Sequence, residues 1–157
     1  MVLKKYILQN KLEDIAPLLE DICTEIKKYI NSEIDLFSAA LYEVIMNAIE
    51  HGNLNFSYET KKELLKKHIY YEKLNEALKT DKALNTYVEI TIKNKKNSIV
   101  INVKDKGFGF NHKQKIKNVN EDGIMRESGR GIAIIKSYFD DVKYNGNSVT
   151  LTKFIQK

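Results

Sequence analysis

The stretch LYEVIMNAIEHGN, residues 41–53, places Glu43, Asn47 and His51 at four-residue intervals within an otherwise hydrophobic segment. This spacing predicts the central helix of the fold, on which these three residues and Glu50 share one polar face. Taken alone, the pattern favours an amphipathic helix whose polar face is simply solvated, so a functional role depends on the rest of the chain. The opposite, hydrophobic face consists of Phe37, Leu41, Val44, Ile45 and Ala48.

The size and composition of the chain predict a single domain over residues 1–157. Of its 157 residues, 43% are hydrophobic, which is enough to bury a core without disulfides or metals. The lone cysteine, Cys23, lies at a hydrophobic helical position and is expected to be a buried, inert thiol. No apolar run is long enough to cross a bilayer, and the N-terminus lacks the apolar core of a signal peptide, so the prediction is a cytoplasmic protein with no membrane partner.

The charge of the chain does not predict nucleic-acid binding. The net charge is +5, but the lysines are spread along the sequence, which is typical of a solvated surface. Both arginines, Arg126 and Arg130, lie close together beside glycines. We therefore expect no direct nucleic-acid partner.

Hydrophobic periodicity predicts an N-terminal strand over residues 4–9, followed by two helices. The first helix covers residues 11–30, with Asn10 or Asp14 as its cap and Pro17 in its first turn. The second covers residues 33–51 and ends at Gly52.

The rest of the chain predicts an insertion, two hairpins and one further helix. A charged helical insertion is expected at about residues 57–81, and residues 111–128 read as a long polar loop. The predicted hairpins pair residues 87–92 with 98–103 and residues 141–144 with 148–155, and a helix is expected over residues 131–139.

The first chemical motif is Asp105-x-Gly107-x-Gly109, directly after a predicted strand. The carboxylate can accept a hydrogen bond from an exocyclic amine, and the glycines allow the backbone to approach a flat ring closely. Taken alone, the same pattern is more typical of a plain turn.

The second motif is Gly129-Arg130-Gly131-Ile132 at the start of a predicted helix. The first amides of a helix have no partner within it, and the helix dipole favours an anion at this end. Arg130 adds a forked donor that suits phosphate oxygens, although a flexible loop leading into a helix has the same composition.

Together, these motifs and the central helix indicate a nucleotide pocket. Asp105 would bind the amine of a purine, the turn from Gly107 to Gly109 would contact its ring, and residues 129–131 would bind phosphates. Asn47 could ligate Mg²⁺, which takes few protein ligands. Glu43, one turn before Asn47, is placed to act as a general base.

These residues give the chain a resemblance to the GHKL superfamily of ATP-binding domains, which includes histidine kinases. Glu43-x-x-x-Asn47-Ala48 resembles its N-box, Asp105-x-Gly107-x-Gly109 its first glycine box and Gly129-Arg130-Gly131-Ile132 its second. Within the superfamily, the chain is most similar to bacterial anti-sigma factors that are also serine kinases. The resemblance covers nearly the whole chain, with the predicted insertion as an addition.

The resemblance implies an α/β two-layer sandwich of the Bergerat type, with helices on one face of a mixed sheet. It implies ATP and Mg²⁺ as cofactors, with Asn47 as metal ligand, Asp105 as the adenine-binding carboxylate and Glu43 as catalytic base. The glycines of both boxes, Arg130 and Ile132 would contact the nucleotide, and residues 111–128 would form the ATP lid. The implied partners are a small antagonist protein as substrate, a sigma factor and a second copy of the chain in a homodimer.

Three departures from the family pattern disfavour a histidine kinase. The second glycine box is short, Glu50 replaces a basic residue common in histidine kinases, and the adenine-side threonine of the last strand has only Ser148 or Thr150 as candidates. The leading hypothesis is a serine/threonine kinase that phosphorylates the antagonist. The alternatives are a nucleotide-gated binding module without phosphotransfer and, less favoured, the catalytic domain of a two-component histidine kinase.

Overall fold

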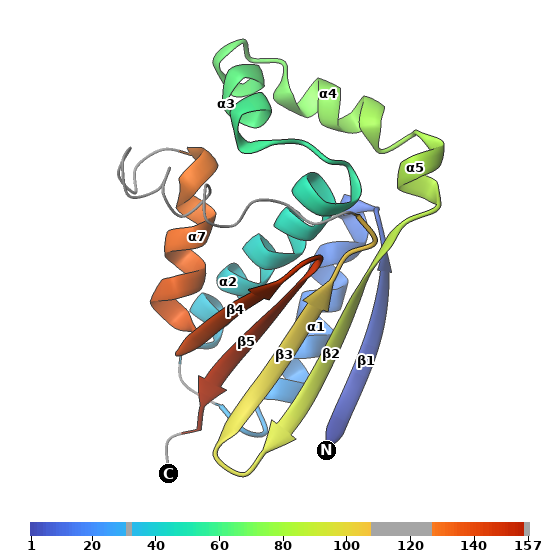
Figure 1. Cartoon of the computed structure of the whole chain (residues 1–157). Coiled ribbons are helices and arrows are strands. Elements are labelled where there is room, and N and C mark those ends of the chain that lie inside the picture. The colour runs from blue at the N-terminus through green and yellow to red at the C-terminus, as the bar shows by residue number, and fades with distance from the viewer. Residues whose placement is uncertain (31–32, 108–126, 156–157) are drawn as a thin grey trace.

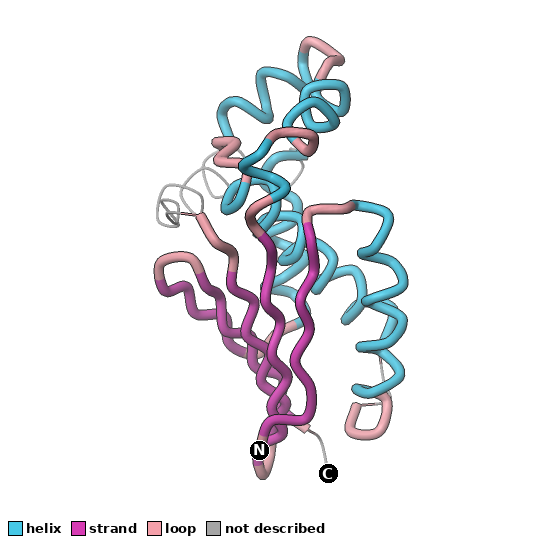
Figure 2. Tube along the Cα trace, turned by 90° about the vertical axis from the view of Figure 1, so that its right-hand side faces the viewer, coloured by secondary structure: helices cyan, strands magenta, loops and turns pink. Residues whose placement is uncertain are grey.

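The fold consists of an antiparallel sheet with helices packed on one face (Figure 1, Figure 2). The computed structural model describes residues 1–30, 33–107 and 127–155, with the backbone alone for residues 127–130. The strands are β1 (Val2–Gln9), β2 (Tyr87–Lys95), β3 (Ser98–Lys104), β4 (Asp141–Asn145) and β5 (Ser148–Phe154). They form one five-stranded sheet in the order β1-β2-β3-β5-β4.

The predicted two-layer α/β sandwich is confirmed, but the sheet is antiparallel rather than mixed. Every pair of neighbouring strands runs antiparallel. The reason lies in the β4–β5 hairpin, which places β5 rather than β4 beside β3. The chain therefore returns to the centre of the sheet in the direction opposite to β3.

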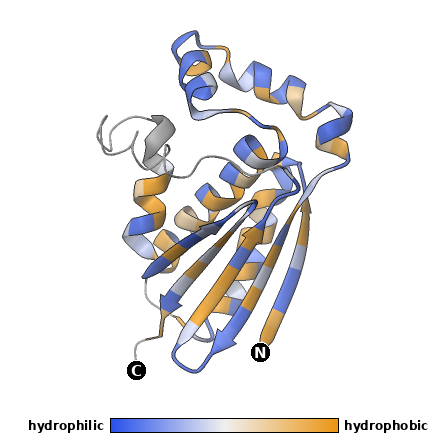
Figure 3. Cartoon of the chain, viewed as in Figure 1, coloured by the Kyte–Doolittle hydropathy of each residue, from blue (hydrophilic) through white to orange (hydrophobic). Residues whose placement is uncertain are grey.

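The core lies between the sheet and the three long helices α1 (Ile15–Ile26), α2 (Ile34–Asn47) and α7 (Glu127–Tyr138). Alternate residues of β2 and β3 face it, and the register sets Ile90 opposite Val103. Hydrophobic residues accordingly follow the central strands and the helices α2 and α7 (Figure 3). On α2, Phe37 is fully buried, and its ring lies 5.7 Å from that of Tyr138 and 6.1 Å from that of Phe139.

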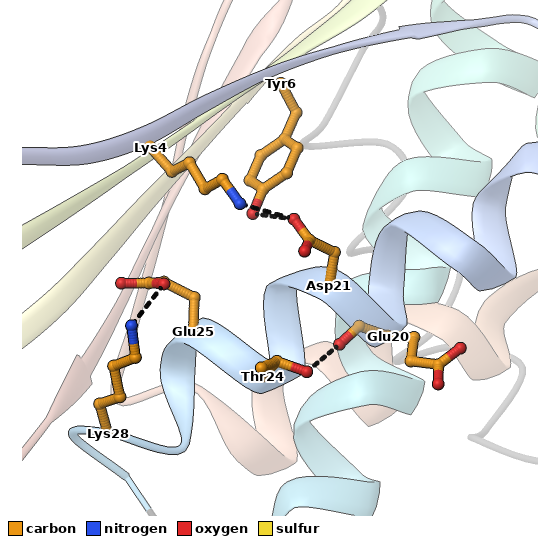
Figure 4. A network of polar contacts seen from close by, with 7 residues as sticks. All are labelled: Lys4, Tyr6, Glu20, Asp21, Thr24, Glu25 and Lys28. Carbon is orange, nitrogen blue, oxygen red and sulfur yellow. Dashed lines mark hydrogen bonds and ion pairs between the residues drawn. The ribbon is translucent and has the colours of Figure 1, made fainter.

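The first helical segment begins with a 3-10 turn (η1, Leu12–Asp14) that leads into α1. Pro17 lies in the first turn of α1, as predicted, but the predicted cap is wrong because Asp14 makes no side-chain capping bond and Asn10 is used in a buried network described below. On the exposed side, Lys4 Nζ and the Tyr6 hydroxyl both donate to Asp21 Oδ2 at 2.8 Å, which joins β1 to α1 (Figure 4).

The central helix changes its pitch near its end. α2 continues directly into a π-helical turn (η2, Ala48–Asn53), so the helical stretch extends past the predicted end at His51. A π-helical turn is wider than an α-helical one, which rotates the later residues relative to the earlier ones. The polar residues of the opening motif therefore do not all face the same way.

The insertion forms three short helices where the sequence predicts one helical segment. They are α3 (Tyr58–Lys66), α4 (Tyr70–Ala77) and α5 (Asp81–Leu84), and they lie together beyond one end of the sheet (Figure 1). His68, with φ of 59°, breaks the helical path after α3. Ser57 and Thr80 cap α3 and α5 by accepting from the backbone N–H groups of Thr60 and Ala83.

The last predicted helix is present and begins earlier than expected, since α7 starts at Glu127. The predicted ATP lid, residues 111–128, lies outside the described residues except for Glu127 and Ser128, which open α7. Within the described part of the chain, none of the helices has the length and apolar character needed to cross a membrane.

We expect Phe37→Ala to lower the free energy of unfolding by about 3–5 kcal/mol, because it leaves a cavity where α2 meets α7. Leu36→Ala is the control, since Leu36 is 36% exposed and should change stability by less than about 1 kcal/mol. Urea denaturation of both variants measures the difference. Equal losses of unfolding free energy in the two variants would show that the packing of Phe37 between α2 and α7 does not stabilise the core.

Candidate functional site

A pocket lies between α2, α7 and the adjoining ends of β3 and β5. Its polar lining comes from Asn47, Asp105, Asn147 and Ser148. A largely apolar pocket with a few polar groups is typical of small-molecule sites. The apolar lining consists of Val44, Ala48, Val103, Ile135, Tyr144 and Val149.

Asp105 follows the last residue of β3 and is buried, with 3% of its surface exposed. Its Oδ1 accepts a hydrogen bond from the Gly107 N–H at 2.8 Å. Its backbone is paired with the β4–β5 turn, because the Asp105 N–H donates to Asn147 O at 2.9 Å and Asn147 Nδ2 donates to Asp105 O at 2.7 Å. The carboxylate is therefore held at a defined point of the pocket.

Burial raises the pKa of Asp105, and the backbone N–H groups of Gly107 and of Asp105 itself oppose part of that rise. Within the described part of the chain, no lysine or arginine forms an ion pair with this carboxylate. The ionised carboxylate is thus poorly compensated, and a hydrogen-bond donor entering the pocket would stabilise it.

Two glycines make room for Asp105. A Cβ atom at Gly52 would overlap the Asp105 carboxylate, and a Cβ atom at Gly107 would overlap the Gly52 carbonyl. The sequence predicts Gly52 only as a helix stop. The structure shows that it is also required for the close approach of η2 to the Asp105 turn.

Asn47 and Glu43, the two predicted site residues of α2, lie in different places: Asn47 lines the pocket and Glu43 lies against α7. Asn47 is half-buried and lines the pocket with Asp105, so two residues that are far apart in sequence are brought together. Glu43, one turn earlier, is half-buried and lies against α7, where a Cβ atom at Gly131 would be 2.6 Å from Glu43 Oε2. Among the described residues, no group of three or more acidic, histidine or cysteine side chains could hold a metal ion.

The second glycine box forms the start of α7. Gly129 and Arg130, of which the backbone alone is described, lie in its first turn, where amides lack partners within the helix. Ile132 is buried with 2% exposure, and Ile135 of the next turn lines the pocket. Gly109 of the first glycine box lies outside the described residues.

Glu50 and His51 do not line the pocket, contrary to the predicted shared polar face. The π-helical turn directs both toward the insertion. The buried Glu50 forms an ion pair with Lys61 at 2.9 Å. His51 Nδ1 contacts the Phe56 carbonyl, and its ring stacks on Tyr58 with centroids 3.8 Å apart.

The sequence did not predict the roles of some residues near the site. Asn147 appears in it only as part of a hairpin turn, although it binds the Asp105 backbone. Of the two candidates for the adenine-side residue, Ser148 lines the pocket, whereas Thr150 accepts from Asn102 Nδ2 at 3.0 Å. The role of Asn53 was likewise not predicted, and Asn10 was predicted only as a helix cap, because the partners of both side chains are distant in sequence.

Comparison with known families finds the histidine kinase-like ATPase domain over residues 10–153. The matched range starts directly after β1 and includes every residue that lines the pocket. No curated protein matches the chain significantly.

We expect Asp105→Asn to stabilise the ligand-free protein near pH 7, by the roughly 0.5–2 kcal/mol typical of stabilising substitutions. Burial raises the pKa of Asp105 in the folded state. The contribution of this carboxyl to wild-type stability is therefore fully present below its pKa in the unfolded chain and is lost as pH rises through its pKa in the folded protein. The advantage of the variant should therefore vanish in acid.

Thermal unfolding of both proteins from about pH 3.5 to about pH 7.5, a range that begins near the usual aspartate pKa and extends well above it, measures this dependence. Asp35→Asn, at an exposed position on α2, serves as the control and should show no such pH-dependent gain. A constant difference between wild type and Asp105→Asn at every pH would contradict the role of burial.

Proposed function

Because the chain belongs to the family of histidine kinase-like ATPase domains, we propose that its pocket binds ATP with Mg²⁺ and that it is a serine/threonine kinase of the anti-sigma-factor type. In this proposal it phosphorylates a small antagonist protein and also binds a sigma factor. The family supports ATP binding. The choice of serine or threonine and of these partners rests on the sequence resemblance.

The buried carboxylate of Asp105 is the observation that carries the proposal. It lines an apolar pocket, lacks an ion pair among the described residues and lies where two glycines leave no space for a Cβ atom. An exocyclic amine can donate to such a carboxylate, and the apolar walls can contact a purine ring. The residues present therefore fit the base of ATP.

Groups on α2 and at the start of α7 suit the phosphates. Asn47 offers an amide oxygen to Mg²⁺, and the first amides of α7 together with Arg130 would bind phosphate oxygens. When bound, MgATP supplies the phosphoryl group and the metal ion that neutralises its charge.

Glu43 is the residue we assign to transfer. Its side chain lies between α2 and the start of α7, one helical turn from Asn47, so it adjoins the proposed phosphate end rather than the base. A carboxylate at this position can accept the proton of a substrate hydroxyl. A Cβ atom at Gly131 would lie 2.6 Å from Oε2, so the Glu43 carboxylate would have to shift.

The insertion supports a second candidate, a nucleotide-gated protein-binding module without phosphotransfer. Its helices expose two large hydrophobic side chains, Tyr71 at 70% and Leu84 at 68%. Pure binding does not require a carboxylate beside the phosphates, so the position of Glu43 favours the kinase.

The experiment that separates the two functions is the intact mass of proteins captured from the native lysate, before and after MgATP is added. A captured small protein that gains one phosphate on serine or threonine supports the kinase. A partner whose mass stays constant, while MgATP changes only its retention, supports the binding module.

We expect Glu43→Gln to retain ATP affinity within about threefold and to lower phosphate transfer at least about 100-fold, the usual contribution of general acid–base catalysis. Titration with ATP measures the first and phosphate incorporation the second. Glu20→Gln, at an exposed position on α1, is the matched control and should retain both. Full transfer by Glu43→Gln would exclude Glu43 as the base.

A further inference from the structure

Two buried asparagines form a hydrogen-bonded relay behind the Asp105 turn. Asn53 is fully buried and Asn10 is 6% exposed. Asn53 Oδ1 accepts from the Lys106 N–H at 2.8 Å, and Asn53 Nδ2 donates to Asn10 Oδ1 at 2.8 Å. Asn10 Nδ2 in turn lies 2.7 Å from Ala83 O and 2.9 Å from Thr86 O. The relay thus links the turn to the end of the insertion.

The relay provides a hydrogen-bond acceptor for the backbone of the Asp105 turn. Three consecutive N–H groups of the turn each have a defined acceptor: that of Asp105 donates to Asn147 O, that of Lys106 to Asn53 Oδ1 and that of Gly107 to Asp105 Oδ1. The bond from the Gly107 N–H ends on the Asp105 carboxylate, which belongs to the same turn, so it does not tie the turn to another part of the protein. Asn53 is the acceptor that comes from the helical layer.

We propose that Asn53, held in place by Asn10, is a positioning residue that sets the selectivity of the pocket for adenine over other purines. This inference rests on the proposed ATP-binding function. Asn53 touches the backbone of the turn and acts through Asp105. Without it, the Lys106 N–H loses its acceptor, the turn shifts and Asp105 no longer meets an exocyclic amine in the required geometry.

Asparagine suits this position because it both accepts and donates. Its amide oxygen satisfies the Lys106 N–H while its amide nitrogen satisfies Asn10 Oδ1. An apolar residue would satisfy neither, and an aspartate could not donate to Asn10. A network with a purely structural role would also need these hydrogen bonds, but its loss would weaken the binding of all nucleotides equally.

The discriminating experiment measures the Kd of the full chain for ATP and for inosine triphosphate, which lacks the exocyclic amine. We expect wild type to prefer ATP about tenfold or more, as a site built to bind a donor group does. Asn53→Ala should bring this ratio close to one while binding of inosine triphosphate changes little. Amide hydrogen exchange at Lys106 should accelerate in the same variant without nucleotide.

Asn102→Ala is the matched control, because Asn102 donates one side-chain hydrogen bond, to Thr150, and does not line the pocket. It should keep the wild-type ratio.

Asn10→Ser is the second variant, because it breaks the relay but leaves the Asn53–Lys106 bond. It should lower the ratio of affinities less than Asn53→Ala does. It decides the test if Asn53→Ala does not fold.

The outcomes separate the two levels of inference. A folded Asn53→Ala protein with the wild-type ratio, or Asn10→Ser with that ratio where Asn53→Ala is unfolded, would overturn the role of the relay alone. Wild-type protein that binds both nucleotides equally would overturn adenine recognition by Asp105, and the positioning role with it.

Discussion

The burial of one carboxylate constrains the whole pocket end of the fold. Asp105 sits where η2, the turn after β3 and the β4–β5 hairpin converge, and each of these segments carries a residue that suits this convergence. Gly52 gives it space, Gly107 donates to it, and Asn147 holds its backbone. Burial disfavours the ionised form and raises the pKa of Asp105, so this arrangement opposes the stability of the ligand-free protein. This cost fits the proposed role of Asp105, in which its carboxylate accepts a hydrogen bond from a ligand.

The change from α-helix to π-helical turn gives the central helix two separate tasks. Before the change, Glu43 and Asn47 face α7 and the pocket. After it, Glu50 and His51 face the insertion, where they meet Lys61 and Tyr58. The Glu50–Lys61 pair is weak evidence for net stability, but removal of Lys61 would leave a buried charge without this partner. The insertion is therefore anchored to the same segment that supports the pocket.

Local patterns in the sequence predicted the elements and much of the site, and the contacts between distant segments account for the rest. The strands were predictable because Val88, Ile90 and Ile92 alternate toward the core. The meeting of Asn47 with Asp105 followed from recognisable motifs. The cap at Asn10 was mispredicted because its side chain is used by partners more than 70 residues away. The π-helical turn and the break at His68 depend on tertiary contacts and backbone angles that no periodicity encodes.

The insertion reaches the Asp105 turn from both of its ends. At its start, Lys61 of α3 binds Glu50, three residues before Asn53. At its end, Ala83 and Thr86 bind Asn10, which holds Asn53 against the turn. Both connections end on η2, the segment whose Asn53 also contacts the backbone of the Asp105 turn. If the pocket ligand and a partner of the insertion each bound one arrangement of η2 more tightly than another, each would change the affinity of the other by the same factor.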